Sequence, residues 1–155
     1  MDTITLGPAR MGDAPHIASM SRTLIEDGLP WSWTPRRVGA HMRQRENLVV
    51  TARSSRELVG FAMAHFGNEN VRLTLLGVAD SHQRRGVGTR LIQWVEESAV
   101  VAGLFTMMLE VRASNVSGRR FYASLGYREV GMVAQYYSGI EDAIRLTRNL
   151  RVSEG

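Results

Sequence analysis

The chain has 155 residues, of which 44% are apolar and 22% charged, a composition that fits one globular domain and argues against intrinsic disorder. Cysteine is absent, which excludes disulfides, thiol catalysis and thiolate metal sites and makes a reducing cytoplasm the expected location. The net charge is +4, and arginine supplies all 19 Lys+Arg residues, so an anion site must use arginine, histidine or backbone N–H groups.

The first half of the chain predicts two helices and four strands. A short strand is expected at 4–6, a helix over 13–25 with Asp13 as its N-cap, and a second helix over 34–45 that begins at Thr34-Pro35. Apolar and β-branched residues then predict three strands, at 47–52, 58–66 and 71–78.

The second half begins with a change of pattern. A polar, basic and glycine-bearing segment, 80–88, precedes an amphipathic helix that Gly103 ends. An apolar strand is expected at 105–111, followed by a helix from Asn115 to about Leu125. The last two strands are expected at 128–133 and 143–150. No linker interrupts the pattern, so the sequence predicts a single mixed α/β domain over 1–155.

No segment has the length and apolar character of a membrane span. The longest nearly apolar run, Ala99 to Leu109, is short and contains Gly103. The first twenty residues lack the apolar core of an export signal. The sequence therefore predicts no membrane association.

The strongest local motif is Gln83-Arg84-Arg85-Gly86-Val87-Gly88, which lies between a predicted strand and a predicted helix. A loop there can direct backbone N–H groups towards a pyrophosphate, and the helix N-terminus adds partial positive charge. A Walker loop is excluded because there is no lysine, and a dinucleotide fingerprint is excluded because Leu91 stands where its third glycine belongs. The alternative is an ordinary turn with solvated arginines.

This loop resembles the Gln/Arg-x-x-Gly-x-Gly/Ala motif of the GNAT N-acetyltransferase superfamily. Two further blocks, Leu109–Asn115 and Phe121–Tyr127, closely resemble the ribosomal-protein-alanine N-acetyltransferases, and Tyr136-Tyr137 with 141–144 extends the likeness. The resemblance implies a mixed α/β, GNAT-like fold. It has a central, mostly antiparallel sheet of six to seven strands with splayed middle strands, and about four helices.

The resemblance also implies a reaction. Acetyl-CoA is the expected acyl donor, a primary amine the acceptor, and a protein or peptide N-terminal α-amine the favoured acceptor. A small-molecule amine acetyltransferase and a non-catalytic acyl-CoA sensor remain alternatives. No metal is expected, because the four histidines show no ligand spacing. The sequence argues against a nucleic-acid partner, since no basic stripe is interleaved with aromatic residues, and a homodimer is kept as an option.

The resemblance assigns the coenzyme to the end of strand 71–78, the loop and the start of two helices. The expected acetyl-CoA contacts are Leu76, Val78, Gln83, Arg84, Arg85, Gly86, Val87, Gly88, Thr89, Asn115 and Tyr122. Asn115 could equally be only a helix N-cap. The Ser117-Gly118 pair departs from the family pattern, and an interior glycine costs a helix about 1 kcal/mol relative to alanine.

Three groups are the expected catalysts. Tyr122 is the candidate acid for the departing thiolate, with a core aromatic as the alternative. Glu110 is the candidate base, because apolar sequence neighbours would raise its pKa; an ion pair with Arg112 or another arginine is the alternative. The Val78 N–H is the candidate oxyanion donor, freed by a strand bulge expected at Gly77, which could otherwise serve packing alone.

The acceptor pocket is expected between two loops, one joining the first two helices and one joining the last two strands. Their aromatic residues are Trp31, Trp33, Tyr136 and Tyr137, which supply stacking surface and hydroxyl donors. The alternative is that these side chains only hold the loops in place.

Overall fold

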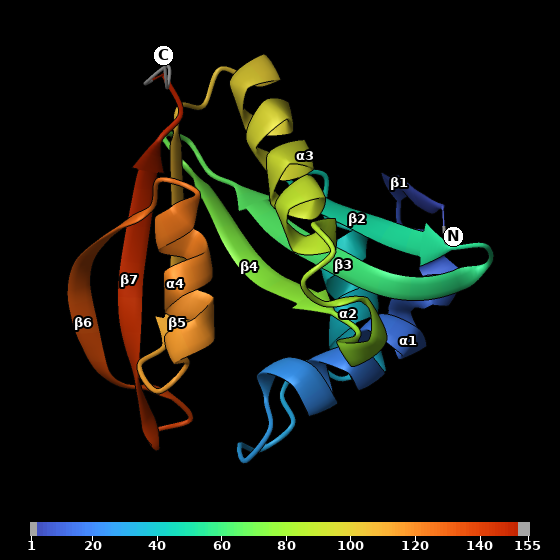
Figure 1. Ribbon diagram of the computed structural model, residues 1–155, viewed down its shortest axis with the longest axis horizontal. Helices are drawn as coiled ribbons and strands as arrows, with labels where there is room; N and C mark the ends of the chain where they lie inside the picture. Colours follow the sequence, from blue (N-terminus) through green and yellow to red (C-terminus); the bar gives the residue numbers. More distant parts are fainter. Residues whose placement is uncertain (1–2, 152–155) are drawn as a thin grey trace.

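The computed structural model describes residues 3–151. They form one seven-stranded sheet, in the order β1-β2-β3-β4-β5-β7-β6, with helices on both faces (Figure 1). All neighbouring strands are antiparallel except β4 and β5, which are parallel. The strands are β1 (Ile4–Pro8), β2 (Asn47–Ser54), β3 (Glu57–Phe66), β4 (Val71–Val78), β5 (Thr106–Arg112), β6 (Arg128–Tyr137) and β7 (Glu141–Asn149). The predicted mixed α/β class and mostly antiparallel sheet are confirmed; 1–2 and 152–155, the ends of the predicted domain, lie outside the described residues.

Four α-helices and three short helical turns complete the described chain. They are η1 (Met11–Asp13), α1 (Ala14–Met20), η2 (Ser21–Ile25), α2 (Pro35–Met42), η3 (Asp80–His82), α3 (Val87–Val101) and α4 (Val116–Ser124). Two of the predicted N-caps are confirmed: Thr34 Oγ1 accepts the N–H of Arg37 at 3.3 Å, and Asn115 Oδ1 accepts that of Gly118 at 2.9 Å.

The first predicted helix is not continuous. The Asp13 side chain does not cap α1; its carboxylate instead accepts the Arg10 N–H at 2.8 Å. At the other end the helix widens into the π-helical turn η2, where the Glu26 N–H donates to Ser21 O, five residues earlier, at 2.8 Å. The Ser21 hydroxyl donates to the Glu26 carboxylate at 2.8 Å, so one buried acid holds this wide turn.

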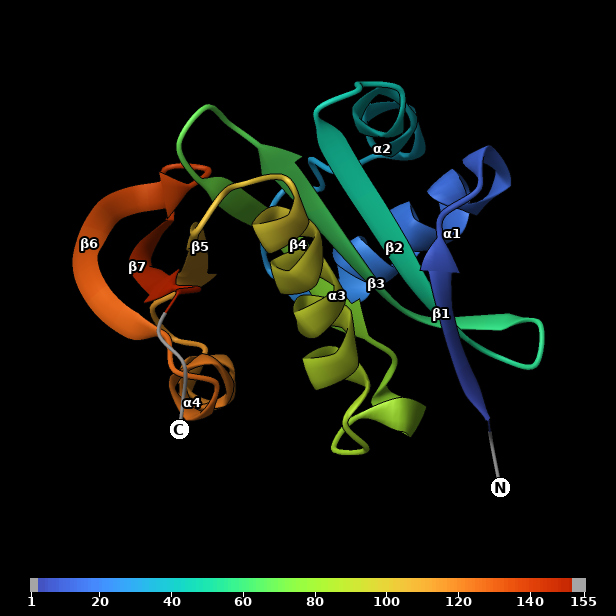
Figure 2. The same ribbon diagram turned by 90° about the horizontal axis from the view of Figure 1, so that it is seen from above.

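Helices lie on both faces of the sheet (Figure 2), and each face has its own apolar core. On one face, α3 buries Leu91 and Val95 against residues that include Leu73 of β4 and Leu109 of β5. On the opposite face, α1 and α2 cover a second cluster of ten buried residues. That cluster comprises Ala14, Ile17, Ala18, Met20, Val38, Val49, Leu58, Phe61, Met63 and Leu75.

Strand β4 contributes to both cores because it contains a bulge. Leu73 packs under α3, whereas Leu75 packs under α1 and α2, although residues two apart in a regular strand share a face. Leu73 pairs with Ala64 of β3, and Leu75 pairs with Met63, so Thr74 is an extra residue without a partner on β3. The bulge at Thr74 therefore reverses the alternation in the second half of β4.

Gly77 is not the bulge, and the prediction that placed one there is wrong. It pairs regularly with Phe61 of β3. A Cβ at Gly77 would lie 2.8 Å from Phe61 Cε1, too close to this buried ring for ordinary van der Waals contact. Close packing, the alternative reading of this glycine, is what the structure supports.

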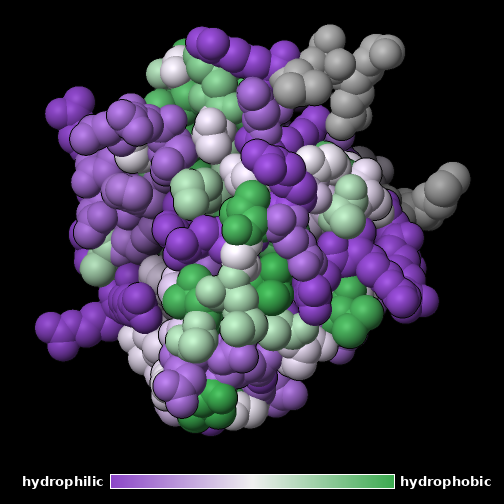
Figure 3. All heavy atoms as spheres, turned by 90° about the vertical axis from the view of Figure 1, so that its left-hand side faces the viewer, coloured by the Kyte–Doolittle hydropathy of each residue, from purple (hydrophilic) through white to green (hydrophobic). Residues whose placement is uncertain are grey.

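The outer edge of the sheet is the curved strand β6. Two apolar residues of β6 are exposed, Val130 by 46% and Met132 by 61%, as is Ile140 in the turn that follows, by 64%. In Figure 3, which views the molecule from this side, apolar side chains are interrupted by polar ones. An edge strand with exposed apolar residues is a surface that can pair with another chain, and the homodimer stays a prediction.

We predict that Gly77→Ala destabilises the protein by about 1–3 kcal/mol, because overpacking a buried ring forces side chains or backbone to shift. Gly131→Ala is the matched control, since a Cβ at this glycine of β6 meets no atom within 4 Å. Urea unfolding followed by circular dichroism measures both. Equal midpoints for the two variants would contradict the packing role.

Candidate active site

The sheet opens at its centre. Strands β4 and β5 pair only between Val71–Leu73 and Met107–Leu109. Beyond these three residue pairs β4 continues to Val78 and β5 to Arg112, and the two strands diverge (Figure 1). The expected splayed middle strands are confirmed. Beyond the paired residues, backbone N–H and C=O groups on the facing edges of β4 and β5 no longer hydrogen-bond across to the other strand.

The N–H groups of β4 near its end point into this opening at alternate residues. The Ala79 N–H donates to Val59 O of β3 at 2.8 Å. Peptide groups alternate between the two neighbours of an antiparallel strand, so the N–H of Gly77 also faces β3 while those of Leu76 and Val78 face the opening. This orientation is the one that an oxyanion donor at Val78 requires.

The loop after β4 is tied to the end of the strand. Gln83 Nε2 donates to Val78 O at 2.9 Å and to Asp80 Oδ1 at 3.2 Å. Arg84 and Gly86 both have left-handed backbone angles, with φ of 62° and 80°. Glycine suits this conformation, whereas at Arg84 it is a strained one.

Gly86 is the N-cap of α3, and no side chain caps this helix. The N–H groups of Val87, Gly88 and Thr89 precede the first helical hydrogen bond, which Arg90 makes to Gly86 O at 3.1 Å. A run of such N–H groups at a helix N-terminus is suited to an anion such as a diphosphate. The predicted coenzyme segment therefore has the local geometry that its motif indicated.

Gly88 brings two helices together beside this N-terminus. A Cβ there would lie 3.3 Å from Phe121 Cζ of α4 and 3.7 Å from Val78 Cγ2. Tyr122, which follows Phe121 in α4, is buried, with 9% of its surface exposed, and belongs to the core under α3. The Tyr122 ring makes edge contacts with Phe121 and Tyr127, at centroid distances of 5.2 and 5.7 Å. Burial raises the pKa of the Tyr122 phenol, which stays protonated.

Asn115 and the glycine that departs from the family pattern belong together. The Asn115 side chain caps α4 by accepting the Gly118 N–H. A Cβ on Gly118 would lie 2.4 Å from Asn115 Nδ2, so this glycine leaves room for the cap. The residue after it, Arg119, pairs with Glu129 through two contacts of 2.9 Å.

Glu110 lies on the other side of the sheet from Tyr122. Its apolar sequence neighbours Leu109 and Val111 face the core under α3, and strand alternation sends the Glu110 side chain to the opposite face. There the carboxyl, 5% exposed, contacts Arg72 Nη1 through Oε1 and accepts from Arg145 Nε at 2.9 Å through Oε2.

The prediction of apolar surroundings for the Glu110 side chain is therefore wrong. The carboxylate is ion-paired, which is the alternative that the sequence left open, and its partners are two arginines other than Arg112. Adjacent positive charge favours the ionised form of a carboxylate. Tyr136 adds a long contact, with its hydroxyl 3.4 Å from Glu110 Oε1.

A cavity of about 310 Å³ lies over Glu110, and we refer to it as the acceptor cavity. Its walls come from the segment between η2 and α2 and from the β6–β7 hairpin, as the sequence predicted. Its floor is the diverging part of β4 and β5. The lining residues are Ile25, Glu26, Leu29, Pro30, Ser32, Trp33, Arg37, Arg72, Leu73, Thr74, Leu75, Glu110, Tyr136, Tyr137 and Ser138.

Three of the four predicted aromatic residues line this cavity: Trp33, Tyr136 and Tyr137. The two tyrosines belong to strand β6 rather than to the expected loop, since β6 continues to Tyr137. Trp31 is not among the lining residues. Its Nε1 donates to Ala18 O at 3.2 Å, and its ring meets the Arg22 guanidinium, so it fastens its segment to α1.

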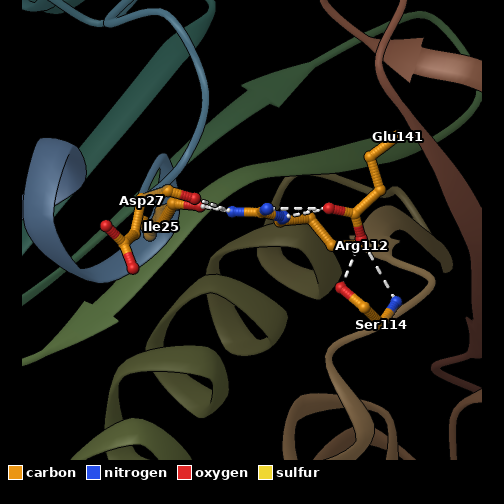
Figure 4. A network of polar contacts seen from close by, with 5 residues as sticks. All are labelled: Ile25, Asp27, Arg112, Ser114 and Glu141. Carbon is orange, nitrogen blue, oxygen red and sulfur yellow. Dashed lines mark hydrogen bonds and ion pairs between the residues drawn. The ribbon is translucent and has the colours of Figure 1, made fainter.

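Arg112 connects the two walls of the cavity (Figure 4). Its Nη1 donates to Asp27 O at 2.6 Å and to Ile25 O at 3.2 Å, at the end of the first helical segment. Its Nε donates to Glu141 Oε1 at 2.7 Å, at the start of β7. The hydrogen bond from the Ser114 hydroxyl and the contacts from Arg112 lower the pKa of Glu141 to about 2.

Glu26 organises one wall in the same manner. Burial alone raises the pKa of this carboxyl, but hydrogen bonds from Ser32, Ser21 and Trp33 outweigh it, and the pKa is lowered. The Ser32 N–H and hydroxyl donate to Oε1 at 2.7 and 2.6 Å. Sequence reasoning missed Glu26, Arg37, Arg72, Arg145 and Glu141. The partners of Arg72, Arg145 and Glu141 are distant in the chain, so no spacing signalled them, whereas Glu26 and Arg37 contact nearby residues in a segment without a recognisable motif.

Comparisons with known proteins agree with this geometry. The model of the acetyltransferase (GNAT) family matches residues 18–127. The N-alpha-acetyltransferase RimI of Mycobacterium tuberculosis is 29% identical over 140 residues, which cover 88% of this chain and 85% of that protein. The [ribosomal protein bS18]-alanine N-acetyltransferase of Salmonella typhimurium is 35% identical over 101 residues, covering 63% and 67%.

A solved structure shows the same fold. The PaiA N-acetyltransferase of Thermoplasma acidophilum, in complex with coenzyme A, has a TM-score of 0.83 at 13% identity, with 95% of this chain and 99% of that chain covered. The chain belongs to the GNAT acetyltransferase family. The class predicted from the sequence, an acetyl-CoA-dependent N-acetyltransferase, is confirmed.

Two kinds of feature are absent from residues 3–151. No helix in that range has the length and apolar character needed to cross a membrane. Within the same range, no group of three histidine or acidic residues is arranged to hold a metal ion.

We predict that Arg112→Gln loosens both walls of the acceptor cavity. The Tm should fall by several degrees, since losing bonds to a charged group costs about 1–3 kcal/mol and 1 kcal/mol corresponds to roughly 2–4 °C at this size. The KM for the acceptor should rise while that for acetyl-CoA stays within about twofold, because the loop and α3 are not touched.

Arg53→Gln is the control for this variant. It breaks an ion pair of comparable length, 2.5 Å to Asp13, that lies away from the cavity. Calorimetry and steady-state kinetics with each substrate varied in turn measure both variants. A rise in acceptor KM of the same size in the control would contradict the assignment to the cavity walls.

Proposed function

We propose that this enzyme transfers the acetyl group of acetyl-CoA to the N-terminal α-amine of a protein or peptide, with Glu110 as the base and Tyr122 as the acid. One observation carries the proposal: the acceptor cavity with Glu110 and the buried Tyr122 lie on opposite faces of the sheet, and the opening between β4 and β5 lies between them. A donor that enters from one face can meet an acceptor that enters from the other.

The donor side is formed by the loop and by α3. The N–H groups from Gly86 to Thr89 suit the diphosphate, and Gln83 fixes the loop against β4. Arg84 and Arg85 add positive charge, and we assign Leu76 of β4 and Asn115, the N-cap of α4, to the coenzyme as the family resemblance implies. Bound there, acetyl-CoA supplies an activated thioester.

The Val78 N–H faces the opening, where it would stabilise the negative charge that develops on the thioester oxygen. The amine nitrogen attacks the carbonyl carbon, the C–N bond forms and the C–S bond breaks. Glu110 receives the proton that leaves the amine, and the Tyr122 phenol gives a proton to the departing thiolate. Burial raises the pKa of the Tyr122 phenol, so its proton is present when the thiolate departs.

The charges around Glu110 favour an α-amine over a lysine side chain. Its carboxylate is already engaged by Arg72 and Arg145, so an acceptor amine that is largely neutral before it binds is favoured. An α-amine has a pKa of about 7.7–8.0, against about 10.4 for lysine, and positive surroundings lower it further. The α-amine is therefore already largely neutral near pH 8. The activities named for the two related sequences, on N-terminal amines, also support this acceptor.

The test is an acceptor screen. The protein is incubated with acetyl-CoA and a library of peptides with free N-termini, alongside free amino acids and polyamines, and products are identified by mass spectrometry. We expect acetylation at peptide α-amines and none at lysine side chains. Acetylation of free small amines alone would favour the small-molecule alternative, and coenzyme binding without turnover would favour the sensor.

Tyr122→Phe should lower kcat by about 10²–10⁴-fold, the usual contribution of a positioned acid, with the Kd for acetyl-CoA little changed. Because burial raises the pKa of this phenol, its protonated form persists above pH 10. The wild-type rate should therefore rise with pH as the amine is deprotonated and show no falling limb up to pH 10. Stopped-flow turnover and calorimetric titration measure these quantities; unchanged kcat in the variant excludes the acid role.

A further inference from the structure

The acidic groups of the acceptor cavity are all engaged by groups of the protein itself. Glu26 accepts hydrogen bonds from Ser21, Ser32 and Trp33, with donor distances of 2.6 to 3.3 Å. Glu110 is paired with Arg72 and Arg145. No carboxylate of the cavity is left to bind a cationic side chain of an acceptor.

One cation of the cavity is not neutralised in this way. Arg37, the third residue of α2, lines the cavity and is exposed. Within residues 3–151 it forms no ion pair with a carboxylate. Its only polar side-chain contact in that range is a long one, from Nη1 to Ser32 O at 3.5 Å.

The position of the Arg37 guanidinium is nevertheless fixed. Its central carbon lies 3.9 Å from the centroid of the Trp33 ring, which also lines the cavity. Stacking on an aromatic face restricts the guanidinium and leaves its N–H edge open to solvent. A preorganised guanidinium edge is the group that binds a carboxylate through two parallel hydrogen bonds.

We propose that the acceptor carries an acidic side chain at its second or third residue and that Arg37 selects it. The inference rests on the proposed peptide acetylation and narrows its substrate class. Residues of an extended peptide advance by about 3.3 Å each, so both positions stay within reach of a cavity wall when the amine is at Glu110. The same guanidinium repels a lysine or arginine at these positions.

The experiment compares matched peptides that differ at the second or third residue, with Glu, Gln or Lys there. For the wild type we expect kcat/KM to fall by about tenfold from Glu to Gln and further to Lys, as for loss of a charge-assisted hydrogen bond. The preference should shrink at high salt, since exposed charges are screened.

Variants of Arg37 and Arg36 separate recognition from folding. R37Q should remove the preference, and R37E should reverse it in favour of Lys. R37E is expected to fold well, because a carboxylate at the third helical position, after Thr34 as N-cap, completes a capping box. R36E is the control: Arg36 is the adjacent exposed arginine but does not line the cavity.

Each outcome decides the point. Reversal by R37E with the wild-type preference kept in R36E supports the proposal. Equal rates for the three peptides in the wild type, or equal losses for all peptides in R37Q, overturn it while leaving peptide acetylation intact. If no peptide of any charge is acetylated, the proposed function itself fails.

Discussion

The parting of β4 and β5 after three paired residues is the constraint on which the site depends. It exposes N–H groups of β4 that a continuous sheet would consume, and it opens a passage between the two faces. The bulge at Thr74 lies where the strands part and reverses which side chains of β4 face each core. Leu75 then packs under α1 and α2, and Leu76 and Val78 direct their N–H groups to the gap. The geometry of the opening is thus a property of backbone pairing.

The acceptor side is held differently, by charged side chains. Arg112 joins the two cavity walls, Glu26 ties the segment before α2, and Arg72 and Arg145 flank Glu110. In each case a carboxylate is matched by donors, which is the condition for burying charge without a large desolvation cost. The consequence is a cavity whose acids are all hydrogen-bonded or ion-paired and whose Arg37 has no carboxylate partner among the described residues.

Much of the fold could be predicted from sequence because its signals are local. Thr34 and Asn115 cap their helices, Gly86 adopts the left-handed angle at α3, and β4 has its predicted bounds. The errors concern tertiary pairing. The sequence predicts the bulge at Gly77, but the missing side chain of this residue leaves room for the ring of Phe61. The bulge lies at Thr74 and needs no glycine. The sequence around Glu110 is apolar and does not show its charged partners, because Arg72 and Arg145 lie on β4 and β7.

The same contrast explains why the family can be recognised in the sequence and the acceptor cannot. The proposed donor site uses main-chain N–H groups and needs only glycines and a strand–helix junction, which leave a short, contiguous motif at 83–88. The acceptor site uses side chains from four separate parts of the chain, such as Glu26, Arg37, Glu110 and Tyr136. Side chains that come from separate parts of the chain leave no contiguous motif. If the proposal for Arg37 holds, acceptor choice depends on single side chains such as this one, which sequence spacing does not reveal.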